Sequence, residues 1–142
     1  MPGTPSEEER EARLGRALRD GVDLYNAGRF FESHEVLEDV WLEEEGDDRA
    51  FLQGIIKLAA AFHHYGKGTY QGMWNLLRAG SRMLQPFRPA YRGVELAHFL
   101  TQIETWIPRA QRLLAGEDVE IRDPVPPLVY RPPGRARSPP EE

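Results

Sequence analysis

The sequence predicts an all-α fold, an antiparallel helical-hairpin bundle of about five helices followed by a proline-rich extended arm. Apolar residues recur at the 3.6-residue spacing of amphipathic helices through most of residues 1–115. Short segments with glycine or proline separate these stretches and favour antiparallel neighbours. Seven of the last 27 residues are proline, which is excluded from helix interiors and central strands. We therefore expect a helical domain over residues 1–115 and an arm over residues 116–142, disordered from about residue 131.

The first two predicted helices flank a turn at residues 26–29. Ser6 followed by Glu9 is a capping-box pattern that starts the first helix. Gly28 can adopt the left-handed conformation that ends it. The core stripe of this helix is Leu14, Leu18, Val22 and Tyr25. The second helix is predicted over residues 30–44, and its core face is Phe30, His34, Leu37 and Trp41.

Three further helices follow. The third, predicted over residues 49–65, is apolar on two faces, so we expect it at the centre of the bundle. Thr69 is placed to cap a fourth helix, which ends at the prolines within residues 86–89. The fifth is predicted over residues 94–114, with a kink or a break at Pro108. The arm residues expected to pack on the bundle are Ile121, Val125, Leu128, Val129 and Tyr130.

Composition and charge narrow the class of protein. The chain has no cysteine, which excludes disulfides, thiolate metal ligands and a cysteine nucleophile. No apolar run is long enough to cross a bilayer and the acidic N-terminus lacks the apolar core of a signal peptide, so we expect a cytoplasmic protein with no membrane partner. Residues 1–50 hold 15 acidic and 6 basic residues, and the later arginines are scattered, which disfavours nucleic-acid binding. A protein partner and homo-oligomerisation stay open, and the acidic stretch 43–48 is a candidate contact for a basic partner.

The second helix carries a group of polar residues typical of a site. His34 and Glu38 lie four residues apart and meet on one helix face, with Glu35 turned about 100° away. This arrangement resembles the H-E-x-x-H zinc motif, except that Glu38 stands in place of the second histidine. A third ligand from the third helix, His63 or His64, would complete a divalent-metal site in which Glu35 serves as the general base.

A structural polar network is the competing interpretation. A buried protonated histidine beside a carboxylate, fixed by an amide such as Gln53, forms a hydrogen-bonded set that needs no metal. Because an unpaired buried polar group costs about 1–3 kcal/mol, such residues usually occur together. Trp41 is then a core anchor of this helix. Adjacent residues of a helix point about 100° apart, so His63 and His64 do not readily bind one ion together.

The stretches LYNAGRFFESHEVLEDVW and FLQGIIKLAAAFHHYGKGTYQGMWNLL resemble the bacterial and archaeal family catalogued as domain of unknown function 309. The resemblance covers roughly residues 22–86, with Lys57 and Met73 as departures. It implies a helical bundle whose second and third helices pack antiparallel, and it implies no activity. The residues that carry it are His34, Glu35, Glu38, Trp41, Gln53, Gly54 and Ala59–Ala61.

Three functional hypotheses follow. The first is a non-enzymatic binding or structural module whose His/Glu/Gln cluster is buried and saturated with hydrogen bonds. The second is a metal-dependent, hydrolase-like enzyme with its site between the second and third helices. The third is a protein-interaction scaffold of the helical-hairpin repeat kind, in which the groove between hairpins, the acidic 43–48 stretch and the proline arm contact a partner.

Overall fold

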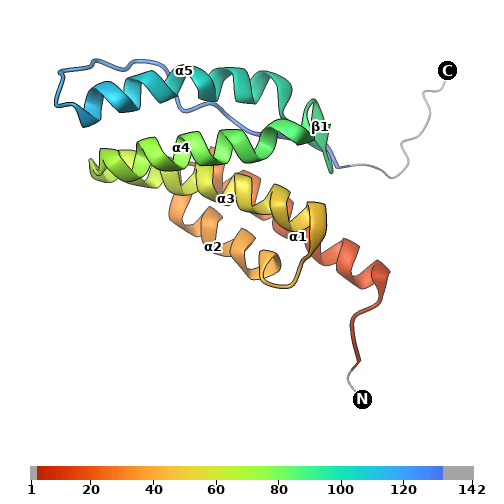
Figure 1. Cartoon of the computed structure of the whole chain (residues 1–142). Helices are drawn as coiled ribbons and strands as arrows, with labels where there is room; N and C mark the ends of the chain where they lie inside the picture. The colour runs from red at the N-terminus through yellow and green to blue at the C-terminus, as the bar shows by residue number, and fades with distance from the viewer. Residues whose placement is uncertain (1–2, 133–142) are drawn as a thin grey trace.

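The computed structural model describes residues 3–132 and has five α-helices in that range (Figure 1). They are α1 (Glu7–Asn26), α2 (Phe30–Trp41), α3 (Gly46–Lys67), α4 (Tyr70–Leu84) and α5 (Ala97–Leu114). A 3-10 turn, η1 (Gln85–Phe87), and three two-residue strands, β1 (Ala90–Tyr91), β2 (Val94–Glu95) and β3 (Val129–Tyr130), complete the described secondary structure. The predicted all-α class is confirmed, and the small antiparallel sheet is an addition that helical periodicity does not reveal.

Each helix packs against the next one along the chain, and α3 lies between α2 and α4 (Figure 1). Glycines bring α3 and α4 close together, because a Cβ atom on Gly54 would lie 2.6 Å from Leu84 and one on Gly80 would lie 2.8 Å from Leu58. On the opposite side of α3, the rings of Phe31 and His63 lie 5.3 Å apart. The helices therefore form antiparallel neighbours, as the short turns predict.

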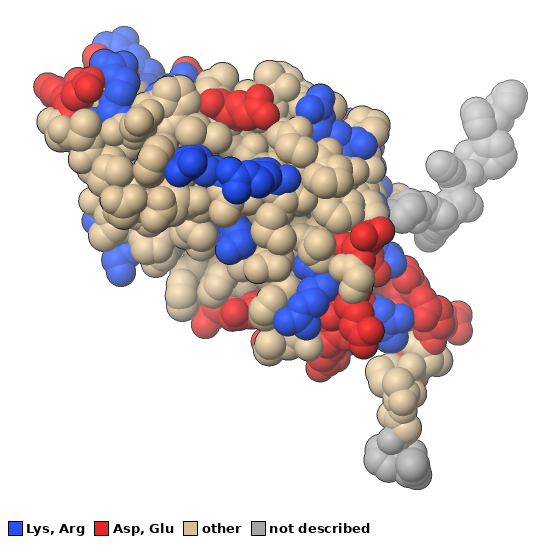
Figure 2. Space-filling view, viewed as in Figure 1, with Lys and Arg blue, Asp and Glu red and all other residues tan. Residues whose placement is uncertain are grey.

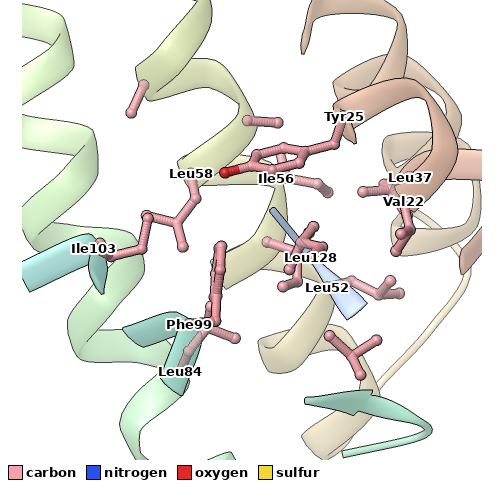
Figure 3. Packing of buried hydrophobic residues seen from close by; sticks show 14 of the residues in the cluster. Val22, Tyr25, Leu37, Leu52, Ile56, Leu58, Leu84, Phe99, Ile103 and Leu128 are labelled. Atoms are coloured by element: carbon pink, nitrogen blue, oxygen red, sulfur yellow. The ribbon is translucent and has the colours of Figure 1, made fainter. Parts of the chain in front are cut away.

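Aromatic rings fill the centre of the core. Tyr25 makes edge-to-face contacts with Phe30, Phe62 and Phe99, at centroid separations of 5.2, 6.3 and 6.2 Å. Figure 3 shows Tyr25 among the aliphatic side chains of several helices and of the C-terminal segment. The prediction that α3 is central is confirmed by its buried residues, which are Phe51, Leu52, Gly54, Ile55, Ile56, Leu58, Ala59, Ala61 and Phe62.

The helix ends match the sequence signals in part. The capping box is present, since Ser6 Oγ accepts from Glu9 N at 3.0 Å and Glu9 Oε1 accepts from Ser6 N at 2.8 Å. Thr69 makes no capping bond to α4, because its hydroxyl donates instead to the carbonyl of His64 at 3.2 Å. Pro108 lies inside α5 without ending it, so the predicted break does not occur.

Several helix boundaries also differ from the predictions by two or three residues. The second helix ends at Trp41 and not at residue 44, and the third begins at Gly46 and not at residue 49. The fifth helix starts at Ala97, because residues 90–95 form a hairpin in which Ala90 pairs with Glu95 and Tyr91 with Val94.

The segment after α5 returns along the bundle and is fastened to the end of α1. Tyr25 donates its hydroxyl hydrogen to the Pro126 carbonyl at 2.8 Å. The amide side chain of Asn26 donates to the Leu128 carbonyl at 2.8 Å and accepts from the Leu128 N–H at 2.9 Å. Leu128 is buried in the core, and β3 then pairs with β2. The disorder predicted from about residue 131 falls almost wholly outside the described residues.

No helix within residues 3–132 combines the length and the apolar character that crossing a bilayer requires.

We expect Asn26→Ala to lower the free energy of unfolding by about 1–2 kcal/mol, because it leaves the Leu128 N–H and carbonyl without their partners. Urea unfolding followed by circular dichroism measures this difference. Gln111→Ala, at an exposed position on α5, is the matched control and should change stability by less than about 0.5 kcal/mol. Equal stabilities of the two variants would contradict this account of the Asn26 contact.

Candidate functional site

Helix α2 buries one face and turns Glu35 and Glu38 of the family-like signature away from the core. Its buried residues are Ser33, Leu37 and Val40. Ser33 is satisfied in the core, because its hydroxyl donates to the Gly21 carbonyl on α1 at 2.7 Å. Gly21 permits this contact, since a Cβ atom there would lie 2.7 Å from Leu37. The core face of α2 is therefore turned by one residue from the predicted one, with a hydrogen-bonded serine where His34 was expected.

The two signature carboxylates are at the surface. Glu35 is exposed, and the side chain of Glu38 is 45% exposed. The prediction of a buried, hydrogen-bond-saturated cluster is therefore wrong for both residues. Because a surface carboxylate needs no internal partner, their presence on α2 is not explained by packing.

His34 lies at the border between the surface and the core. Its side chain is 26% exposed, and its Nε2 lies 3.9 Å from Glu38 Oε1, which is a loose ion-pair distance one helical turn away. Its Nδ1 is shielded from solvent and has no hydrogen-bond partner within the described part of the chain. The ring of Phe31 lies 5.8 Å from the imidazole. His34 thus packs against Phe31 and lies loosely beside Glu38.

Trp41 is half-buried at the far end of the same side of α2. The guanidinium carbon of Arg49 lies 4.1 Å from the centre of its ring, a cation–π contact between α2 and α3. Gln53 is half-buried on α3, and no hydrogen bond joins it to His34 or Glu38 in the structure of residues 3–132. The amide predicted to fix the histidine is therefore not bonded to it.

The two histidines of α3 have different surroundings. His63 packs against Phe31, with ring centroids 5.3 Å apart. His64 Nδ1 lies 2.6 Å from Thr69 Oγ1, and its ring lies against Gly72 at the start of α4. Among residues 3–132, no group of three or more His, Asp or Glu side chains is placed to hold a metal ion. His34, Glu38, His63 and His64, the predicted ligands, thus do not form such a group.

These residues instead form a continuous strip on the surface, which we call the signature face. Phe31 and Leu42 mark its two ends and are 47% and 62% exposed. Eleven residues of a helix return to within about 20° of the starting direction, so both side chains point outward along the same line of α2. The members of the signature face are Phe31, His34, Glu35, Glu38, Trp41 and Leu42 of the α2 region with Gln53 and His63 of α3.

A second polar cluster, which the sequence analysis did not find, joins α1, α3 and the hairpin. Arg92 donates to both carboxylate oxygens of Glu11 at 2.7 and 2.9 Å, and to both oxygens of Asp48 at 2.6 and 3.0 Å. Tyr91 donates its hydroxyl hydrogen to Asp48 Oδ1 at 2.6 Å. Arg92 has a positive φ of 48° and precedes Gly93, a turn pattern that could have predicted the hairpin. The partners of Arg92 lie 44 and 81 residues away in the sequence, so no short sequence pattern predicts these contacts.

The charges of this cluster hold one another in the ionised form. Burial by itself raises the pKa of Asp48, but the hydrogen bonds from Arg92 and Tyr91 outweigh it and leave the pKa below its ordinary value. The hydrogen bond from Arg92 also lowers the pKa of Glu11. Burial and the bond to Asp48 raise the pKa of Tyr91 to about 12. The cluster therefore stabilises the fold at neutral pH.

The acidic stretch 43–48, considered as a contact for a basic partner, is largely engaged within the chain. Glu44 is only 4% exposed and accepts from Arg10 at 2.6 Å. Glu43 forms an ion pair with Arg13, and Asp48 belongs to the Arg92 cluster. Arginines of α1 and of the hairpin thus pair with three of the five acidic residues of this stretch, and Glu45 and Asp47 stay exposed.

Comparison with known proteins supports the resemblance. The sequence profile of the family described as "Domain of unknown function (DUF309)" matches residues 18–76. The chain is 28% identical over 96 residues to an "Uncharacterized protein" of Aquifex aeolicus (strain VF5), covering 67% of this chain and 28% of that protein. It is 31% identical over 78 residues to "Uncharacterized protein YpuF" of Bacillus subtilis (strain 168), covering 54% and 45%. Each match spans less than half of the relative's length, and the predicted family resemblance is confirmed.

We expect the stability of the chain to fall between pH 6 and pH 3, and to fall less in Asp48→Asn. Since the pKa of folded Asp48 is lowered, its contribution is present above the ordinary carboxyl range, near pH 4, and is lost as the pH falls through the lowered folded value. At pH 6 the variant should be less stable by about 1–2 kcal/mol. Urea unfolding at both pH values measures the difference.

Asp47→Asn is the matched control, because Asp47 is the exposed neighbour of Asp48 on α3. A pH dependence of Asp48→Asn that equals that of the unchanged chain would show that the ion pair with Arg92 does not stabilise the fold.

Proposed function

Because residues 18–76 match the DUF309 family and the carboxylates of the resembling motif lie on the surface, we propose that the chain is a non-enzymatic helical module that binds another polypeptide through the signature face. The observation that carries this proposal is the orientation of α2. Its buried side is Ser33, Leu37 and Val40. Of the α2 residues that resemble the family signature, Glu35 and Glu38 lie on the outward side, whereas His34 and Trp41 lie at the border with the core.

Exposed apolar side chains at both ends of the face favour binding. Phe31 and Leu42 are the two most exposed of the four large apolar residues that reach the surface in the described range. Single exposed apolar residues are ordinary, but here two of them lie on one line of a helix, one at each end, with half-buried Trp41 close to the second. Aromatic residues of this kind often anchor protein interfaces.

The charges between these anchors indicate the chemistry of the partner. Glu35 and Glu38 lie between Phe31 and Leu42 on the outward side of α2, whereas Glu43, Glu44 and Asp48 are paired with arginines of the same chain. A partner segment that presents basic side chains between apolar ones would match this pattern.

A photo-crosslinking residue at Phe31 tests the proposal in cells that express the chain, with the same residue at exposed Gln111 on α5 as the control. We expect a defined adduct from position 31 and none from position 111. The partner is then identified by mass spectrometry, purified and titrated against the purified chain by calorimetry.

In that titration we expect the double variant Phe31→Ala/Glu35→Ala to weaken binding at least about tenfold, because an apolar anchor and a charge leave the interface together. Its melting temperature should fall by no more than about 3 °C, since both side chains are mainly exposed. Unchanged affinity, with a large fall in melting temperature for His34→Ala, would show instead that the signature serves folding.

A further inference from the structure

We infer that the partner of the signature face is a second copy of this chain. The two copies are related by a two-fold axis that lies in the plane of the face, parallel to α3. This inference rests on the proposed function and names the partner. It follows from the side-by-side arrangement of α2, α3 and α4, from the opposite charges of α2 and α4, and from the positions of these charges along the helix axes.

Helices α2, α3 and α4 lie side by side in Figure 1 and form one side of the molecule. Helix α3 is in the middle, with α2 beside its His63 edge and α4 beside its Gly54 edge. Between these edges α3 presents a partly exposed stripe at helical spacing. This stripe consists of Gln53, Lys57, Ala60 and His64.

The two flanking helices carry opposite charges on their exposed sides. The outward residues of α2 include Glu35, Glu38 and Asp39, and those of α4 include Arg78 and Arg82. No acidic residue occurs anywhere in residues 49–94, whereas this stretch has seven lysines and arginines. In Figure 2, basic side chains run across the middle of this side, whereas most acidic ones gather at the lower right, near the start of α1 and the end of α2.

A two-fold rotation places these opposite charges over each other. When the axis lies in the plane of the face and parallel to α3, the rotation brings α2 of one copy over α4 of the other, and α3 over α3. The pairing of α2 with α4 then occurs twice, as every contact does in an isologous dimer. A closed dimer results, and no charged side of α2 or α4 is left unmatched.

The charges also lie at matching heights along the helices. Phe31 of α2 is beside His63, and Gly72 of α4 is beside His64, the next residue of α3. Phe31 and Gly72 are therefore at nearly the same position along the α3 axis. Both helices run antiparallel to α3 and thus parallel to each other. Glu38 follows Phe31 by seven residues and Arg78 follows Gly72 by six, which puts both about 9–11 Å further along at 1.5 Å per residue. Glu38 of one copy therefore faces Arg78 of the other.

The size of the face sets the strength of the dimer. Helices α2 and α4 have 12 and 15 residues, which correspond to about 18–22 Å. Three helices about 9 Å apart make a face about 27 Å wide, so the dimer buries about 1,000–1,200 Å² in total. This area is at the lower limit of specific interfaces. The two Lys57 side chains lie near the axis and repel each other, so we expect a dissociation constant in the micromolar range.

Sedimentation equilibrium of the full chain between about 1 and 500 μM, at low and high salt, tests the inference. We expect a reversible monomer–dimer equilibrium that weakens with salt and stops at the dimer. Glu35→Lys/Glu38→Lys should raise the dissociation constant at least tenfold, and so should Arg78→Glu/Arg82→Glu. Asp20→Lys/Asp23→Lys, at exposed positions of α1, makes the same charge change as the first variant away from the face and should have no effect.

Mixing the two charge-reversed variants gives the decisive result. In a mixed dimer both α2–α4 contacts again join opposite charges, so association should return to the strength of the unchanged chain. Lys57→Met should tighten the dimer. A chain that stays monomeric at 500 μM, a mixture that does not associate, or a mass that grows beyond the dimer would overturn the two-fold arrangement.

The two tests separate the inference from the proposed function. If the chain is monomeric but the crosslinker at Phe31 captures a different protein whose affinity falls in Phe31→Ala/Glu35→Ala, the binding function holds and the second copy is excluded. If the dimer forms and the charge-reversed mixture rescues it, the crosslinker at Phe31 should join two copies of the chain.

Discussion

The close contact of α3 with a helix on each side is the constraint on which the rest of the structure depends. Gly54 and Gly80 let Leu84 and Leu58 fill the space where Cβ atoms would otherwise stand, so α3 and α4 approach closely. Gly21 does the same between α1 and Leu37 of α2. Because α3 has α2 and α4 on its two sides and the hydrophobic core beneath it, only one narrow stripe of its surface is exposed to solvent. That stripe, together with the outward sides of α2 and α4, is the surface at which we place function.

The distribution of charge follows from the same arrangement. Arginines on α1 and in the hairpin pair with the acidic residues between α2 and α3, which draws the ends of these elements together. The carboxylates that remain without an arginine partner within residues 3–132 include Glu35 and Glu38 on the outward side of α2. Internal pairing of the neighbouring acids thus leaves the signature face as a distinct acidic strip with apolar ends.

Helical periodicity was sufficient to predict the fold class and the central place of α3, and the spacing of Ser6 and Glu9 predicted the capping box. Periodicity failed at the register of α2, because the stripe drawn through the large apolar residues of this helix includes His34 and excludes Ser33. The serine bonds a carbonyl of α1, a contact that exists only once the helices have packed. The Arg92 cluster was missed for a related reason, since its partners are remote in sequence. The chemistry-bearing residues of α2 could be named from sequence, but the side of the helix they occupy is a property of the tertiary fold.

The fastening of the C-terminal segment has a consequence for the order in which the chain folds. Asn26 and Leu128 are 102 residues apart, so their contact closes one of the longest loops in the structure. Contacts among α1, α2, α3 and α4 join neighbours in sequence and cost less loop-closure entropy. A chain emerging from the ribosome can therefore assemble these four helices while the segment with Leu128 and β3 is still being synthesised. The face formed by α2, α3 and α4 is then already present.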